Sequence, residues 1–177
     1  MITLRKITLE NRRDIFNLEV SEEQRRFVAS NLSSVASCYV LATNGGQPFP
    51  FAIYADEQPV GFVMITYRIT GYDLPRIADD GYCILRLMMG KQHQNKGYGR
   101  EAMVRILEFI RTFPAGPATY CWIPYSAENF VAKKLYESFG FRDNGEICHN
   151  EQITVLKLCD AAWDQTIRLH MEKSVGE

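Results

Sequence analysis

A short turn between two apolar segments carries the residues best suited to binding a charged ligand. Gly97 and Gly99 stand one residue apart. Lys96 and Arg100 add positive charge beside them, and no acid lies between residues 90 and 100. Glycines let a backbone approach a ligand closely, and the unpaired amides at the start of a helix favour an anion. We therefore expect this turn to bind a phosphate-like group.

Three kinds of phosphate-binding turn contain glycines at such a position. A P-loop requires G-x-x-x-x-G-K-[ST], and Gly90-Lys91 is not followed by serine or threonine. Residues 97–102 formally fit the Rossmann pattern G-x-G-x-x-A, but they begin well beyond the preceding strand, and residues 114–123 lack the required acid. The remaining interpretation is Q-x-x-G-x-G, from Gln94 to Gly99, whose successive amides would hold a pyrophosphate.

The elements on either side must position this turn. Residues 82–89 form an apolar run of strand length, and apolar residues then recur at helical spacing from Tyr98 to Phe113. Ser21 with Gln24 forms a capping-box pattern, which predicts a second helix as far as residue 30. We expect strands at 2–7, 51–55, 60–67, 82–89, 118–123 and 153–158, a short strand within 141–150, and helices at 11–18, 21–30, 97–113, 127–139 and 160–173.

This order predicts an α/β fold, in which a mixed sheet of the α+β kind carries helices on both faces. The expected domain spans residues 1–158, and residues 159–177 form a helical tail. The chain has 177 residues, of which 46% are hydrophobic and 23% charged, with a net charge of −1. These values are ordinary for a globular domain and give no case for nucleic acid or an anionic membrane as partner.

Compartment and metal content follow from what the sequence lacks. The opening residues have no apolar core of a signal peptide, and no apolar run approaches the ~18 residues of a membrane span. Five scattered cysteines without a C-x-x-C pair indicate reduced thiols in the cytoplasm. Three well-separated histidines show no metal-ligand spacing. We expect a cytoplasmic protein without a metal.

Two blocks of sequence resemble one known superfamily. The stretch Gln94 to Gly99, after an apolar strand and before a helix, resembles the acyl-CoA pyrophosphate loop of the GNAT N-acetyltransferases. The segment NFVAKKLYESFGF (129–141) is similar to their N-x-x-A-x-x-L-Y-x-x-x-G-F block. The blocks stand in the expected order with one strand between them, and the resemblance covers roughly residues 2–158. It implies the GNAT fold, acetyl-CoA as cosubstrate and direct acetyl transfer to an amine.

The resemblance also implies where the donor binds. Strand 82–89 should diverge from strand 118–123, so that the pantetheine arm enters between them and the amide of Met89 polarises the thioester carbonyl. Tyr136 should point towards the sulfur and act as the acid for the leaving thiolate. The residues that we expect to bind acetyl-CoA are Leu87, Met88, Met89, Gln94, Asn95, Lys96, Gly97, Tyr98, Gly99, Arg100, Asn129 and Lys134.

The acceptor amine must lose a proton before it reacts, because amines of the lysine type have a pKa near ~10.4. Some superfamily members carry an acid on the central strand, whereas this chain has no acid between residues 81 and 100. Other acids, with Glu22 and Glu23 among them, are candidates for the base or for a group of acids that attracts a polycation. The residues that we expect to bind the acceptor are Glu19, Asp79, Asp80 and Tyr82.

A third segment, residues 21–39, resembles the corresponding part of bacterial spermine/spermidine acetyltransferases and implies a polyamine acceptor. The sequence therefore predicts an acetyl-CoA-dependent N-acetyltransferase acting on a primary amine, preferably spermine or spermidine. The alternatives are another amine (a protein N-terminus, an amino acid or an aminoglycoside) and a non-catalytic acyl-CoA-binding regulatory module. A homodimer paired through the tail is a further open alternative.

Overall fold

The computed structural model describes residues 1–69 and 73–158, apart from the side chain of Asp80. The predicted tail 159–177, its helix at 160–173 and any pairing through it lie outside the described residues. None of the described helices is long and apolar enough to cross a membrane.

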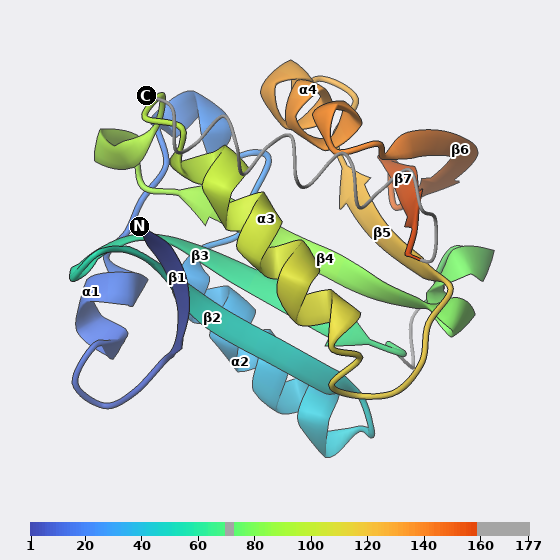
Figure 1. The fold of residues 1–177 in the computed structure, drawn as a ribbon, viewed down its shortest axis with the longest axis horizontal. Coiled ribbons are helices and arrows are strands. Elements are labelled where there is room, and N and C mark those ends of the chain that lie inside the picture. Colours follow the sequence, from blue (N-terminus) through green and yellow to red (C-terminus); the bar gives the residue numbers. More distant parts are fainter. Residues whose placement is uncertain (70–72, 159–177) are drawn as a thin grey trace.

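A seven-stranded mixed sheet forms the centre of the molecule (Figure 1). The strand order is β1-β2-β3-β4-β5-β7-β6, and every neighbouring pair is antiparallel except β4 and β5, which run parallel. This confirms the predicted fold class. The strands are β1 (Ile2–Lys6), β2 (Gln47–Ala55), β3 (Gln58–Tyr67), β4 (Gly81–Met89), β5 (Tyr120–Tyr125), β6 (Arg142–Cys148) and β7 (Glu151–Lys157).

Helices cover both faces of this sheet. α3 and α4 lie on one face, and α1 and α2 lie on the other (Figure 1). The helices are α1 (Arg12–Phe16), α2 (Asn31–Thr43), α3 (Tyr98–Arg111) and α4 (Phe130–Ser138), with short 3₁₀ turns at η1 (Glu22–Gln24), η2 (Arg76–Asp80) and η3 (Lys91–His93).

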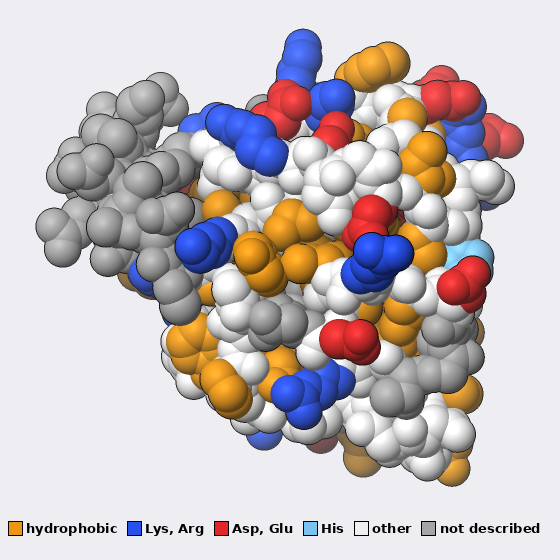
Figure 2. Space-filling model, turned by 90° about the vertical axis from the view of Figure 1, so that its right-hand side faces the viewer, with side chains coloured by type: hydrophobic (Ala, Val, Ile, Leu, Met, Phe, Trp, Pro, Cys, Tyr) orange, Lys and Arg blue, Asp and Glu red, His pale blue; other side chains and the backbone are white. Residues whose placement is uncertain are grey.

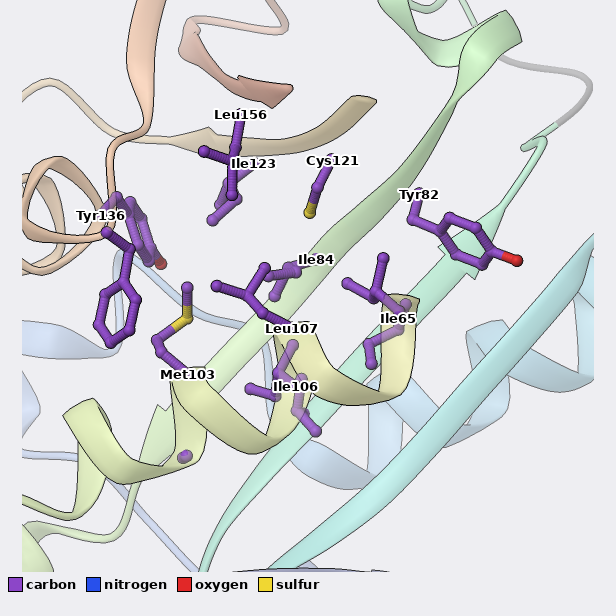
Figure 3. Packing of buried hydrophobic residues seen from close by; sticks show 14 of the residues in the cluster. Ile65, Tyr82, Ile84, Met103, Ile106, Leu107, Cys121, Ile123, Tyr136 and Leu156 are labelled. Carbon is purple, nitrogen blue, oxygen red and sulfur yellow. The ribbon is translucent and has the colours of Figure 1, made fainter. Parts of the chain in front are cut away.

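The main core lies between α3 and the sheet. Met103, Ile106 and Leu107 of α3 are fully buried in one cluster with Ile84 of β4 and Ile123 of β5 (Figure 3). This packing explains the helical spacing of apolar residues seen in the sequence, because those positions form the buried face of α3. It also fixes the start of α3 beside the end of β4.

The predicted second helix at 21–30 was wrong. Ser21 and Gln24 do form a capping box, but it encloses only the single 3₁₀ turn η1. The helix begins at Asn31, where the side chain of Ser30 accepts a hydrogen bond from the amide of Ser33 at 3.2 Å. Its sequence, NLSSVASCYVLAT, contains small and hydroxyl residues and no charge, so a contrast between an apolar and a charged face is missing.

Candidate active site

The two parallel strands separate part of the way along the sheet. β4 and β5 pair only at Gly81–Cys83 with Tyr120–Trp122, and no further pairing follows. A register shift between Met64 and Ile65 marks a bulge at Leu85, where β4 bends. The second half of β4 therefore has an open edge facing β5, as the resemblance implied.

Alternation along β4 decides which backbone groups face this gap. Gly90 donates its amide to the carbonyl of Val60 at 2.9 Å, so the pair Val60–Gly90 is hydrogen-bonded across the β3–β4 ladder. In an antiparallel ladder alternate residues turn their backbone groups to the other side. Leu87 and Met89 therefore present their amides and carbonyls to the gap. Met88 turns its own towards β3, so its predicted backbone contact with the donor is not available.

The start of α3 has the features of an anion site. Gly97 is the N-cap, with the left-handed φ of 78°, and none of the described side chains caps the helix. Apart from the chain neighbours of Gly97, no atom of residues 1–69 and 73–158 lies within 4 Å of the position that a Cβ at Gly97 would occupy. Lys96 and Arg100 are exposed beside it. The first amides of the helix are therefore accessible and lie in a positive field, which fits a pyrophosphate.

A cavity of about 230 Å³ occupies the gap between β4 and β5. Its walls come from the end of β4, the following loop, the end of β5, α4 and the segment 20–28. Lys96, Gly97, Tyr98 and Arg100 belong to the adjoining turn without lining the cavity, and Lys134 is exposed on α4. The predicted residues that do line it are Leu87, Met88, Met89, Gln94, Asn95, Gly99, Asn129 and Tyr136.

Asn129 has a structural task within this wall. Its Oδ1 accepts a hydrogen bond from the amide of Ala132 at 3.1 Å, which makes it the N-cap of α4. The predicted helix start at 127 was therefore wrong by about one turn. Capping at Asn129 fixes the phase of the helix, which places Tyr136 on the side that faces the cavity.

Tyr136 reaches the cavity from α4 and is almost fully buried, with 7% of its surface exposed. Its ring packs edge-on against Tyr125, with centroids 6.0 Å apart, at the margin of the apolar cluster (Figure 3). Within the described part of the chain its hydroxyl has no hydrogen-bond partner. Burial, and then the charge of Glu151, raise the pKa of this phenol. It therefore stays protonated at neutral pH, which suits a proton donor.

The predicted group of acids that would attract a polycation does not form. Asp79 belongs to η2, which precedes β4, whereas the carbonyl of Glu19 accepts a hydrogen bond from the amide of Lys91 just after β4. Along β4 these ends are roughly 26 Å apart. The side chain of Asp80 lies outside the described part. On the side of the molecule where η2 lies, the green turn at the right of Figure 1, acids and bases are interspersed (Figure 2).

Glu19 itself lies beside a second, adjoining pocket and pairs with Arg25 at 3.3 Å. Tyr82, also expected at the acceptor site, is fully buried in the core. Its hydroxyl donates to the carbonyl of Gly116 and accepts from the amide of Ala115, both at 2.9 Å. Tyr82 and Tyr136 lie at opposite ends of the apolar cluster (Figure 3). We therefore remove Tyr82 from the site.

Two charged residues that line the cavity were missed from the sequence, Glu151 and Arg86. Glu151 is the first residue of β7, and it reaches the cavity only because β7 lies beside β5 in the sheet. Burial raises the pKa of its carboxyl group, while the charges of Arg86 and His149 lower it. No local sequence signal marks Glu151, because its role depends on strand order.

Side-chain contacts hold the segment 20–28 against two parts of the protein, the loop after β4 and the loop before α4. The side-chain amides of Gln24 and Gln94 exchange hydrogen bonds of 3.2 and 2.8 Å. Gln94 also donates to the carbonyl of Met89 at 3.0 Å, so its side chain serves the protein rather than an anion. On the other side, Arg26 forms an ion pair of 2.6 Å with Glu128.

Comparisons with known proteins agree with this geometry. Two Bacillus subtilis proteins, a spermine/spermidine N(1)-acetyltransferase (strain 168) and a probable spermine N(1)-acetyltransferase (subsp. natto), are 25% and 26% identical over 164 residues. Each match covers 88% of this chain and 97% of the relative.

Among solved structures, aminoglycoside acetyltransferase AAC(6')-Ib with coenzyme A superposes with a TM-score of 0.71 at 18% identity, covering 99% of this chain and 100% of that one. Spermidine N-acetyltransferase from Vibrio cholerae, with CoA and spermine, gives 0.65 at 17% identity, covering 89% and 95%. These likenesses support the fold. The family model of the GNAT acetyltransferase domain matches residues 1–142. The chain belongs to the GNAT family of acetyltransferases.

Proposed function

We propose that the protein transfers the acetyl group of acetyl-CoA directly to a primary amine, and that the preferred acceptor is a polyamine such as spermidine or spermine. One observation carries the proposal: β4 leaves β5 after three residue pairs, and Tyr136 and the start of α3 stand at the resulting gap. Such a gap offers an extended ligand backbone partners along its length and an anion site at its end.

The donor half of the reaction uses main-chain groups. The exposed amides at the start of α3 would bind the pyrophosphate, with Lys96 and Arg100 as counter-charges. Leu87 and Met89 would pair with the pantetheine arm. The amide of Met89 would donate to the thioester oxygen as negative charge develops there. Lys134, exposed on α4, remains the candidate for the 3′-phosphate.

Tyr136 supplies the proton that the leaving thiolate needs. Its hydroxyl is protonated at neutral pH and has no hydrogen-bond partner in the described residues that would compete for it. A purely acyl-CoA-binding module would have no use for a buried, unpaired phenol in the cavity. Tyr136 therefore favours catalysis over a regulatory role.

The polyamine acceptor rests on the names of the two Bacillus relatives and on the resemblance of residues 21–39. A panel of amines tested for CoA release decides the matter. It should contain spermidine, spermine, a monoamine, kanamycin, an amino acid and a peptide with a free N-terminus. Fastest thiol release with a polyamine supports the proposal. Fastest release with kanamycin would assign the aminoglycoside alternative, and no release with any amine would favour the non-catalytic module.

At low salt, spermidine should be acetylated with a kcat/KM about ten-fold higher than a monoamine of equal length, because the carboxylate of Glu19, at the pocket that adjoins the cavity, attracts the extra positive charge. The advantage should shrink as salt rises and screens those charges. Glu19→Gln should raise the KM for spermidine two- to three-fold, a rough figure for one exposed charge. Asp79→Asn, at the other end of β4, is the control and should leave KM unchanged. Equal rates for both amines at low salt would reject the polyamine acceptor.

A further inference from the structure

We propose that Glu151 is the carboxylate that holds the acceptor's ammonium group and takes its proton before acetyl transfer. The proposal rests on the acetyltransferase function above and names the residue that completes it. Glu151 was not among the acids expected from the sequence, and it enters the site from β7 rather than from the central strand.

The position of Glu151 follows from the sheet register. Tyr125, the last residue of β5, pairs with Gln152, so Glu151 lies beside the point where β5 ends. β4 and β5 run parallel, and their carboxyl ends form the open end of the gap. Glu151 therefore stands at the same end of the sheet as Met89. Among the described residues it is the only acid that lines the cavity, which it shares with Tyr136.

The carboxylate of Glu151 has no partner of its own in the described part of the chain. The other acids of the β6–β7 hairpin are engaged: Glu146 accepts a hydrogen bond from Asn144 at 2.8 Å, and Asp143 accepts from Tyr125 at 3.0 Å. Arg86 shares the cavity, yet it donates to the carbonyl of Leu85 at 2.6 Å and forms no ion pair with Glu151. A half-buried carboxylate without a partner is costly, and an incoming ammonium would satisfy it.

The surroundings adjust this acid for proton transfer. Burial is the largest effect and raises the pKa of this carboxyl group. Its carboxylate is therefore a stronger base than that of an exposed glutamate, which suits proton transfer near neutral pH. The titratable or charged groups that face it are Arg86 and Cys83 from β4, Tyr136 from α4, Cys148 from β6 and His149 from the hairpin turn. Arg86 and His149 oppose the effect of burial and favour the ionised form of the carboxyl group.

Glu151, Tyr136 and solvent together account for every proton in the reaction. One ammonium proton passes to a carboxylate oxygen of Glu151, and the neutral nitrogen forms its bond to the thioester carbon. The carbon–sulfur bond breaks, and the sulfur takes the proton of Tyr136. The nitrogen sheds a second proton, which restores the phenol through solvent. Glu151 then releases its proton to solvent, so the net products are the acetamide, the CoA thiol and one proton.

Glu151→Gln tests the assignment in the full-length protein. With spermidine, or with the fastest amine of the panel, kcat/KM at pH 8 should fall on the order of 10²-fold, typical of a positioned base. In the wild type kcat/KM should rise with pH through the pKa of Glu151, and this rise should disappear in the variant. Glu146→Gln, on the same hairpin and with the same loss of charge, is the control. Its activity and pH profile should match the wild type.

Two further measurements separate catalysis from a structural role. Calorimetric binding of spermidine to the CoA complex should weaken about ten-fold or more in Glu151→Gln and not in Glu146→Gln. The melting temperature should not fall: the pKa of Glu151 is raised in the folded state, so its ionised form costs stability above that pKa, and the neutral amide removes the cost. If Glu151 had only a structural role, its substitution would lower the melting temperature of the protein.

Two results would overturn the assignment in distinguishable ways. If Glu151→Gln keeps its pH profile and a kcat/KM within about three-fold of the wild type, Glu151 is not the base, although the acetyltransferase function stands. If the wild-type protein releases no CoA with any amine of the panel, the proposed function fails and the role of Glu151 fails with it.

Discussion

Replacing Gly97 with valine should abolish measurable acetyl-CoA binding while the protein stays folded. The new Cβ would be sterically free among the described residues, because beyond its chain neighbours none of their atoms lies within 4 Å of that position. It would instead project into the space where the phosphates approach the first amides of α3. A valine is also strained at the φ of 78°, so the loop would shift. Calorimetry should show affinity weakened on the order of 10²-fold or more.

Gly45→Val is the matched control for this strain. Gly45 follows α2, has a φ of 84° and, beyond its chain neighbours, likewise has no described atom within 4 Å of the position of an added Cβ. Both variants should lose about 1–2 kcal/mol of stability from the left-handed backbone, and their melting temperatures should fall alike. Only Gly97→Val should lose acetyl-CoA binding. Unchanged affinity in Gly97→Val would remove the glycine turn from the donor site.

Tyr136→Phe should lower kcat on the order of 10²-fold or more at saturating acetyl-CoA, because the change removes only the proton donor and keeps the ring. Acetyl-CoA affinity should hardly change. The melting temperature should also be retained, since the hydroxyl of Tyr136 has no hydrogen-bond partner among the described residues. A normal kcat would remove Tyr136 from the catalytic site.

Tyr82→Phe provides the opposite pattern and serves as the control. Its hydroxyl makes two buried hydrogen bonds, to Gly116 and from Ala115, far along the core from the cavity. Removing it should cost about 1 kcal/mol, or roughly 3 °C in melting temperature, with kcat unchanged. Loss of activity in Tyr82→Phe would instead restore the original expectation that this residue meets the acceptor.

The parts of the site that the sequence predicted are those encoded by neighbouring residues. The glycine turn and the block around Tyr136 each lie within one strand-to-helix or helical segment, where spacing determines geometry. Backbone roles along β4 were harder to predict. The pairing of β4 with β3 decides whether the backbone groups of Met88 or those of Met89 face the gap. A shift of the register by one residue would exchange the two.

The residues around the acceptor amine were predicted less well, because tertiary structure brings them together. Asp79 lies just before β4 in sequence, whereas Glu19 is far from β4 in sequence and contacts Lys91 just after it, so the length of the strand separates the two acids. Glu151 is far from β4 in sequence and close to it in space, because β7 is inserted next to β5. The order of strands in a sheet is set by packing of the whole domain, and a single sequence pattern does not reveal it.

The separation of β4 from β5 gives the sheet a third edge, inside the molecule. Leu87 and Met89 lack the strand partners that a continuous ladder would supply, so the protein is less stable than a closed sheet of the same length would be. On the function proposed, the donor completes this edge. Bound at 100 times its Kd, acetyl-CoA would contribute about 2.7 kcal/mol to folding by mass action. Resistance to heat and to proteolysis should therefore follow the supply of the donor, and the enzyme should last longest when its own substrate is abundant.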